Sequence, residues 1–186
     1  LFAVKDRVIG RNNVIIAAVG DITPDELRRR VAPILARLPD VTPPDDLAPP
    51  VFARFEAPVA IDFDQTQTIV YAVAPAFPRT DPDNYAARVV SHILGAGGLS
   101  SRLSERVRNQ LGLVYGINSS YSGRADYGSV SFNFATANEA ADDALDATLE
   151  IWRDFAENGP TAEEVEEAIA YLTGSYANYF LNSNDV

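Results

Sequence analysis

The sequence predicts an α+β fold, in which helices pack on one face of a largely antiparallel sheet. Apolar runs of strand length are interspersed with helical patterns in the order β, α, β, α, α, β, β, α, α. Two of these runs, residues 114–122 and 128–136, flank a short turn that contains Gly123, which is typical of an antiparallel hairpin. A length of 186 residues is ample for one hydrophobic core and scarcely enough for two, so residues 1–186 are expected to form a single domain.

The first predicted elements are a buried strand and a capped helix. Residues 13–19 form a continuous apolar run that ends at Gly20-Asp21, which predicts a strand buried on both faces. The segment Thr23-Pro24-Asp25-Glu26 is a capping box with proline at the first helical position, so a helix begins there. The proline-rich residues 39–50 are incompatible with helix or central strand and predict an extended connector inside the domain.

Helices and strands alternate through the rest of the chain. Residues 61–74 predict a strand, and residues 81–94 predict a helix with apolar side chains at helical spacing. A glycine-rich corner separates this helix from a second one, which stops at Gly112. After the hairpin come two long helices, and the last begins at a capping box in residues 161–164.

Composition excludes several classes of function. A formal net charge of -11 repels phosphate groups, so no nucleic-acid partner is expected. No apolar run approaches the roughly 20 residues that a membrane-spanning helix needs. The absence of cysteine excludes disulfides and thiol catalysis and leaves the cellular compartment open. Because the chain starts at Leu1 without an initiator Met or a signal peptide, we expect it to be a fragment of a longer chain.

The histidine content and the glycine cluster exclude further chemistry. His92 is the only histidine, so this chain cannot form a two-histidine zinc site or a Ser-His-Asp triad. The apolar neighbours of His92 on a helix favour a structural role. Residues 95–98 lack the preceding strand and the following lysine of nucleotide-binding loops, so a corner between helices is favoured over the alternative of nucleotide binding.

The most informative segment runs from Leu94 to Tyr115. A glycine-rich corner is followed by Ser-Ser-Arg-Leu at residues 100–103 and then by Arg108, Gly112, Leu113 and Tyr115. This pattern resembles the second, inactive-type domain of the insulinase or pitrilysin family of zinc peptidases, which includes the mitochondrial processing peptidase. The resemblance covers nearly the whole chain, because residues 11–13 before the first apolar run and residues 159–161 before the last helix are also similar to the family.

The resemblance implies partners rather than a complete active site. In this family an H-x-x-E-H helix of another domain or subunit holds zinc, with Glu as the general base. That motif is absent here, so no cofactor is expected in this chain, and zinc is expected in the partner. The implied parent is a metallopeptidase, a dimeric or two-half assembly that acts on peptides, in which this domain is inactive alone. Homodimer, heterodimer and single-chain arrangements all stay open.

The resemblance also implies roles for individual residues. Arg108 and Tyr115 are expected to reach the partner's zinc site, where they contact substrate carbonyls and stabilise the transition state. Ser119 and Tyr121 are expected to line the same face as further substrate contacts. Arg102 is expected to contact backbone or the acidic surface instead. The alternative function is a catalytically silent scaffold domain of the same family.

Overall fold

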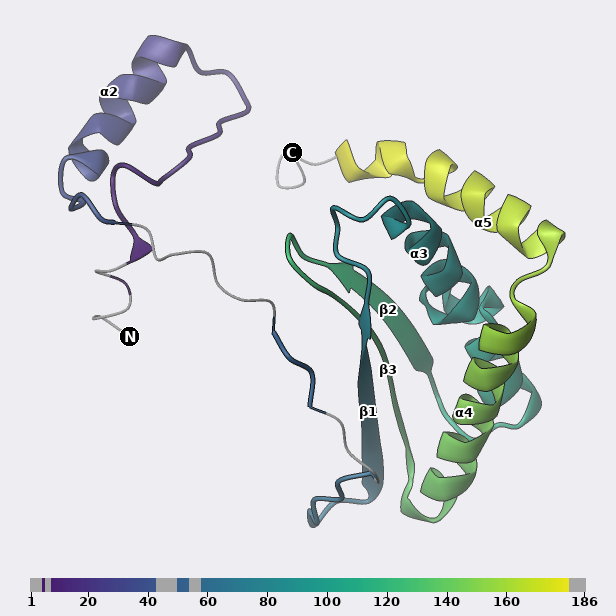
Figure 1. Cartoon of the computed structure of the whole chain (residues 1–186). Coiled ribbons are helices and arrows are strands. Elements are labelled where there is room, and N and C mark those ends of the chain that lie inside the picture. Colours follow the sequence, from purple (N-terminus) through teal and green to yellow (C-terminus); the bar gives the residue numbers. More distant parts are fainter. Residues whose placement is uncertain (1–4, 6–7, 43–49, 54–57, 181–186) are drawn as a thin grey trace. The chain divides into compact units, whose positions relative to one another are not determined.

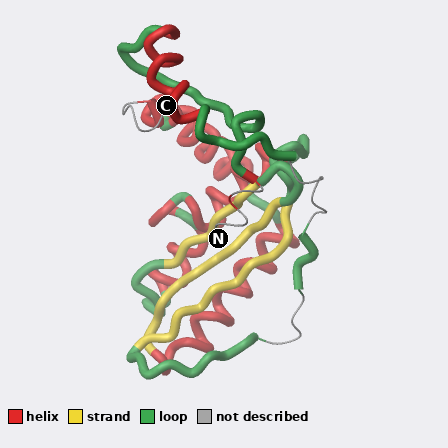
Figure 2. The backbone as a smooth tube through the Cα atoms, turned by 90° about the vertical axis from the view of Figure 1, so that its left-hand side faces the viewer, coloured by secondary structure: helices red, strands yellow, loops and turns green. Residues whose placement is uncertain are grey.

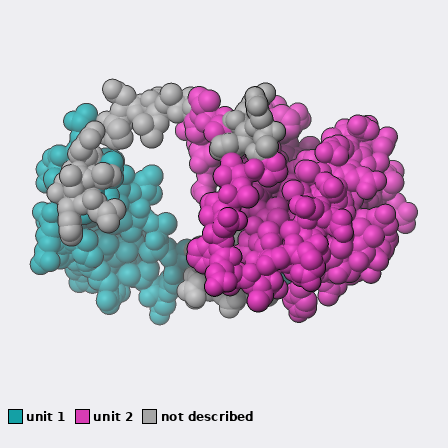
Figure 3. All heavy atoms as spheres, turned by 90° about the horizontal axis from the view of Figure 1, so that it is seen from below, with its two compact units in different colours: residues 1–48, 175–186 teal, residues 49–174 magenta. Residues whose placement is uncertain are grey.

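The computed structural model describes residue 5 and residues 8–42, 50–53 and 58–180, which Figure 1 draws as coloured ribbon. The chain divides into two compact units, shown in different colours in Figure 3. Unit 1 comprises residues 1–48 and 175–186, and unit 2 comprises residues 49–174. The single domain over residues 1–186 stays a prediction. Most of the expected connector, residues 43–49, lies outside the described residues.

Unit 1 contains the predicted capped helix. Helix α2 (Pro24–Leu35) begins where the capping box places it, because the backbone N–H of Glu26 donates to Thr23 Oγ1 at 3.2 Å. Proline at the first helical position leaves no orphaned donor there. Two ion pairs, Arg28 with Asp25 and Arg30 with Glu26, lie along the exposed helix surface. Local sequence chemistry therefore accounts for this helix.

The prediction of a strand at residues 13–19 is wrong for this structure. The segment belongs to no helix or sheet, and Ile15 is 94% exposed. The physical reason is the lack of a partner, since a strand is stable only when a neighbour satisfies its backbone groups. No strand occurs in the part of unit 1 that the structure describes.

Unit 2 is built on a three-stranded antiparallel sheet. Its strands are β1 (Gln67–Ala76), β2 (Ile117–Gly123) and β3 (Gly128–Ala137), in the order β1-β3-β2. The predicted hairpin of β2 and β3 is confirmed, and the backbone N–H of Arg124 donates to Tyr127 O at 2.7 Å across its turn. Phe134 on the central strand lies opposite both Val70 and Ile117, so the inward residues form one apolar layer.

Helices cover one face of this sheet, as Figure 2 shows with the strands in front and the helices behind. They are α3 (Asn84–Ser91), α4 (Ala141–Asn158) and α5 (Ala162–Gly174). The predicted α+β class is therefore confirmed. None of the helices that the structure describes is long and apolar enough to cross a membrane.

The core of unit 2 lies between the sheet and these helices. Leu103 and Val107 are fully buried, and each contributes roughly 1.5–3 kcal/mol through removal of its side chain from water. Phe132 packs against Trp152 of α4 with ring centroids 5.3 Å apart. The segment between residues 101 and 107 is therefore anchored in the core, which positions the residues that follow it.

Candidate functional site

A glycine-rich corner leads into the candidate site. Helix α3 continues as a π-helical turn (His92–Ala96), and the N–H of Gly97 donates to His92 O at 2.8 Å. Gly95 packs so closely on β2 that a Cβ atom there would lie 2.6 Å from the backbone nitrogen of Ser119. The glycine is thus required for close packing, and the cluster forms the expected corner between helical segments.

The segment that carries Arg108 is a second π-helix, from Ser104 to Gln110. The N–H of Leu111 donates to Arg106 O at 3.0 Å, five residues back rather than the four of an α-helix. The segment that stops at Gly112 was predicted as an ordinary helix, so the wider turn is a finding of the structure. Such turns are rare and occur often at functional sites.

Gly112 turns the chain back toward this helix. Its φ of +64° is a left-handed conformation that a residue with a Cβ adopts at a cost, and its N–H donates to Arg108 O at 3.1 Å. The N–H of Leu113 then donates to Val107 O at 3.0 Å. This reversal brings the backbone of Tyr115 alongside the Arg108 side chain.

Arg108 and Tyr115 are direct neighbours. Arg108 Nε donates to Tyr115 O at 2.7 Å, and the guanidinium carbon lies 6.0 Å from the centroid of the Tyr115 ring. The Tyr115 side chain is 92% exposed, whereas Arg108 is half-buried. The structure thus presents a phenol hydroxyl and a guanidinium on one surface of unit 2.

A hydrogen-bonded chain of side chains orients Arg108. Its Nη1 donates to Asn109 Oδ1 at 2.8 Å, and Asn109 Nδ2 donates to Glu105 Oε2 at 2.8 Å. The hydrogen bond from Asn109, and then the one from Gln110, lowers the pKa of the Glu105 carboxyl below its usual value, and desolvation opposes this shift. Glu105 and Asn109 were not predicted as site residues, although their i, i+4 spacing on a helix is a signal for such a pair.

Ser119 and Tyr121 lie on β2, and no hydrogen bond in the described part of the chain joins either of them to Arg108 or Tyr115. Ser119 has no exposed surface, and its hydroxyl is buried without a hydrogen-bond partner. The hydroxyl of Tyr121 donates to Phe77 O at 2.8 Å. The burial of Ser119 is at odds with direct substrate contact, and the expected substrate contact of Tyr121 stays a prediction.

Arg102 has a structural contact, as expected. Its Nε and Nη2 donate to the two carboxylate oxygens of Glu164 at 2.6 and 2.7 Å, and Nη2 also donates to Gly159 O at 3.2 Å. The guanidinium lies 4.8 Å above the ring of Phe155. Glu164 also completes the predicted capping box, because it accepts from the N–H of Thr161 at 2.7 Å.

The electrostatics of this ion pair are strongly favourable. The hydrogen bonds from Arg102 are the largest cause that lowers the pKa of Glu164 to about 2, and bonds from Thr161 add to the effect against desolvation. The pair joins the start of the segment at residue 102 to the connection between α4 and α5. It therefore holds the helix that carries Arg108 in place.

His92 and the acidic side chains form no metal site. His92 is half-buried, stacks on Tyr171 with centroids 4.8 Å apart, and has a pKa lowered by desolvation. Within the described ranges, no three His, Cys, Asp or Glu side chains converge in a way that could hold a metal ion. With one histidine and no cysteine, the donor set of this chain does not fit a peptidase zinc site.

Comparisons with known proteins agree on one family. The family model described as the peptidase M16 inactive domain matches residues 3–172. An uncharacterized zinc protease of Streptomyces coelicolor is 36% identical over 101 residues, which are 54% of this chain and 22% of that protein. A non-peptidase homolog of Helicobacter pylori is 29% identical over 175 residues, 91% of this chain and 39% of that protein.

A solved structure is similar over almost all of the chain. The peptidase M16 inactive domain from Pseudomonas fluorescens superposes with a TM-score of 0.75 at 28% identity, covering 99% of this chain and 44% of that one. The chain therefore spans less than half the length of these relatives.

Proposed function

The chain belongs to the peptidase M16 inactive-domain family, and on this premise we propose that it binds peptide substrate and stabilises the transition state at a zinc site of another domain or subunit. The family match confirms the resemblance to insulinase-type zinc peptidases. The proposed partner is a catalytic H-x-x-E-H domain or subunit, in a dimeric or two-half assembly. Zinc bound there would polarise the peptide carbonyl and activate water.

One observation carries the proposal, namely the adjacency of Arg108 and Tyr115 at the surface. The 2.7 Å bond from Arg108 Nε to Tyr115 O fixes the guanidinium beside an exposed phenol. Within the described part of the chain, no hydrogen bond involves Arg108 Nη2 or the Tyr115 hydroxyl. Both donors are therefore available to a bound peptide.

Peptide hydrolysis requires hydrogen-bond donors of the kind that Arg108 and Tyr115 supply. Attack on a peptide carbonyl builds negative charge on its oxygen, and a donor aimed at that oxygen stabilises the transition state more than the ground state. The Tyr115 hydroxyl can donate one such bond. Arg108 supplies planar N–H groups for a second carbonyl of the substrate backbone or for a carboxylate.

Glu105 and Asn109 act in this proposal as positioning residues. An arginine side chain has several rotatable bonds, and their freedom is lost when substrate binds. The Glu105–Asn109–Arg108 chain restricts part of that freedom before binding, because Asn109 is itself held by the carboxylate. Preorganisation of this kind raises affinity without a further contact to substrate.

The test is turnover of a peptide by the complete assembly, with the catalytic partner present. We expect Arg108→Ala and Tyr115→Phe each to lower kcat/KM on the order of a hundredfold, as for loss of one transition-state donor. Asn109→Ala should lower kcat/KM by a smaller factor, and in an Arg108→Ala background it should cause no further loss of kcat/KM. The matched control is Arg106→Ala, which removes an exposed arginine bonded to Gln110 on the same π-helix.

The second candidate function is a catalytically silent scaffold domain. It is favoured by the relative of Helicobacter pylori named a non-peptidase homolog, which aligns with 91% of this chain. The same assay separates the two candidates. If kcat/KM is unchanged in both Arg108→Ala and Tyr115→Phe while the assembly stays intact, the contact role is refuted and the scaffold role is supported.

A further inference from the structure

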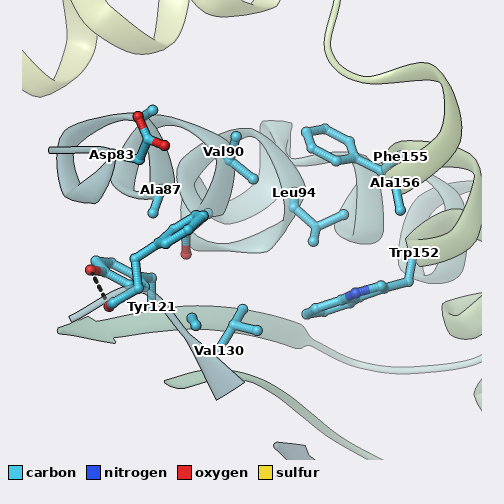
Figure 4. Close-up of a pocket in the computed structure, with 13 residues that line it drawn as sticks. Asp83, Ala87, Val90, Leu94, Tyr121, Val130, Trp152, Phe155 and Ala156 are labelled. Carbon is cyan, nitrogen blue, oxygen red and sulfur yellow. Dashed lines mark hydrogen bonds between the residues drawn. The ribbon is translucent and has the colours of Figure 1, made fainter. Parts of the chain in front are cut away.

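Unit 2 contains an apolar cavity that the proposed function does not use. Its volume is about 510 Å³, within the usual range of small-molecule sites. Figure 4 shows Val90 of α3 and Leu94 of the π-helical turn that follows it pointing into the space above the sheet, with Trp152 entering from α4. Val130 of β3 lines it from the sheet side. The cavity thus lies between the helix layer and the inner face of the sheet.

One polar group of the cavity has no partner. Ser91 lines the cavity and is 5% exposed, and its hydroxyl oxygen is buried without a hydrogen bond. A buried hydroxyl is almost always hydrogen-bonded in a native protein, because leaving it unpaired is costly. The other lining hydroxyl, of Tyr121, is already bonded to Phe77 O. A ligand with one oxygen atom suited to hydrogen bonding would satisfy this group once the Ser91 side chain turns about χ1 toward the cavity.

The charge of the lining restricts the ligand further. Asp83, at the start of α3, is the only charged residue among the described residues that line the cavity. A carboxylate or phosphate placed there would meet no cation and would be repelled by Asp83. Burial of an unpaired charge in an apolar space is unfavourable by itself.

We propose that this cavity binds a neutral, mainly hydrocarbon small molecule that carries one hydroxyl or carbonyl group, which bonds to the Ser91 hydroxyl. The hydrocarbon part contacts Leu94, Trp152 and Phe155. This proposal is independent of the role of Arg108 and Tyr115, so either can fail without the other.

The chain contains a built-in reporter for the test. Trp152 is the only tryptophan, so a change in its fluorescence reports directly on the cavity wall. We expect octan-1-ol to change this emission saturably and to raise Tm, since a ligand that binds only the folded state stabilises it. Octanoate, with the same chain length and a negative charge, should bind more weakly.

Two buried serines provide a matched pair of variants. Ser91→Ala removes the unpaired hydroxyl in the cavity and should weaken octan-1-ol binding by about threefold to tenfold. Ser119→Ala removes an equally buried, unpaired hydroxyl that does not line the cavity, and should leave the affinity unchanged. Ala87→Phe should abolish binding of octan-1-ol because the larger side chain fills the cavity. If this variant fails to fold, Ala156→Phe fills the cavity from α4 instead.

Three kinds of result would overturn the proposal. The first is the absence of any saturable change in Trp152 emission up to the solubility limit of octan-1-ol. The second is unchanged affinity in a folded cavity-filling variant, which would place the alcohol elsewhere. The third is equal weakening by Ser91→Ala and Ser119→Ala, or octanoate binding as tightly as the alcohol, which would remove the assignment of a neutral, hydroxyl-bonded ligand.

Discussion

Removal of the charge of Glu164 should weaken the fold by an amount that depends on pH. Glu164→Gln keeps the size of the side chain and breaks its charge-assisted bonds to Arg102. The pKa of Glu164 falls from 4.5 to about 2 on folding, and each pKa unit corresponds to about 1.4 kcal/mol. The full shift would therefore amount to about 3.4 kcal/mol. Because 27% of the side chain is exposed and solvent screens the pair, we expect about 1–2 kcal/mol near neutral pH.

The sign of the pH dependence follows from the direction of the shift. A carboxyl whose pKa is lowered by folding stabilises the folded state fully above its unfolded pKa. That contribution is lost as the pH falls from about 4.5 to about 2. The difference in stability between the native sequence and Glu164→Gln should therefore be constant above about pH 5.5 and should shrink steadily below it.

The assay is urea unfolding followed by Trp152 fluorescence at a series of pH values. Near neutral pH the variant should also lose about 2–8 °C in Tm. Asp154→Asn is the control, because Asp154 lies 3.5 Å from Arg102 and is more than half exposed, so its removal should cost under about 1 kcal/mol. The reasoning is refuted if the native chain and Glu164→Gln lose stability in parallel between about pH 7 and pH 3.

Three further substitutions test the packing around the site. Gly95→Ala places a Cβ atom 2.6 Å from Ser119 and should destabilise unit 2 by about 1–3 kcal/mol in thermal unfolding. The control is Gly174→Ala, which should be neutral or slightly stabilising because the space around Gly174 is open. Gly112→Ala should lower the free energy of unfolding by about 1–2 kcal/mol, because residue 112 has a φ of +64°. It should also lower peptide turnover by the assembly more than this loss of stability explains. Unaltered turnover would show that the chain reversal at Gly112 is unimportant for activity. Leu103→Ala should cost about 2–5 kcal/mol in urea unfolding, and a loss under 1 kcal/mol would mean that its site is not well packed.

Much of unit 2 could be predicted because local signals and periodicity agree there. The capping box at Thr161 and the alternation of Phe132 and Phe134 are short-range features, and both appear in the structure. The strand predicted at residues 13–19 depended on a distant partner that periodicity does not reveal. An apolar run specifies a strand only when another strand lies beside it.

The predicted site was less complete for a similar reason. Ser119 and Tyr121 were expected on the same face as Arg108 and Tyr115 from the resemblance alone. Strand β2 begins only at Ile117, so Tyr115 lies before the strand that carries Ser119 and Tyr121, and no strand periodicity relates them. The π-helix was also outside the reach of sequence patterns, since it differs from an α-helix by one step in hydrogen-bond register.

The wide helical turn before Gly112 holds one residue more than an α-helix of the same axial length, because its hydrogen bonds span five residues instead of four. Loss of a single residue from Ser104–Gln110 would let the segment relax to α-helical register while Leu103 and Gly112 on either side keep their positions. Loss of a residue between Gly112 and Tyr115 would have no such compensation and would move Tyr115 away from the Arg108 side chain. In this domain the tolerance for a one-residue deletion therefore changes at Gly112.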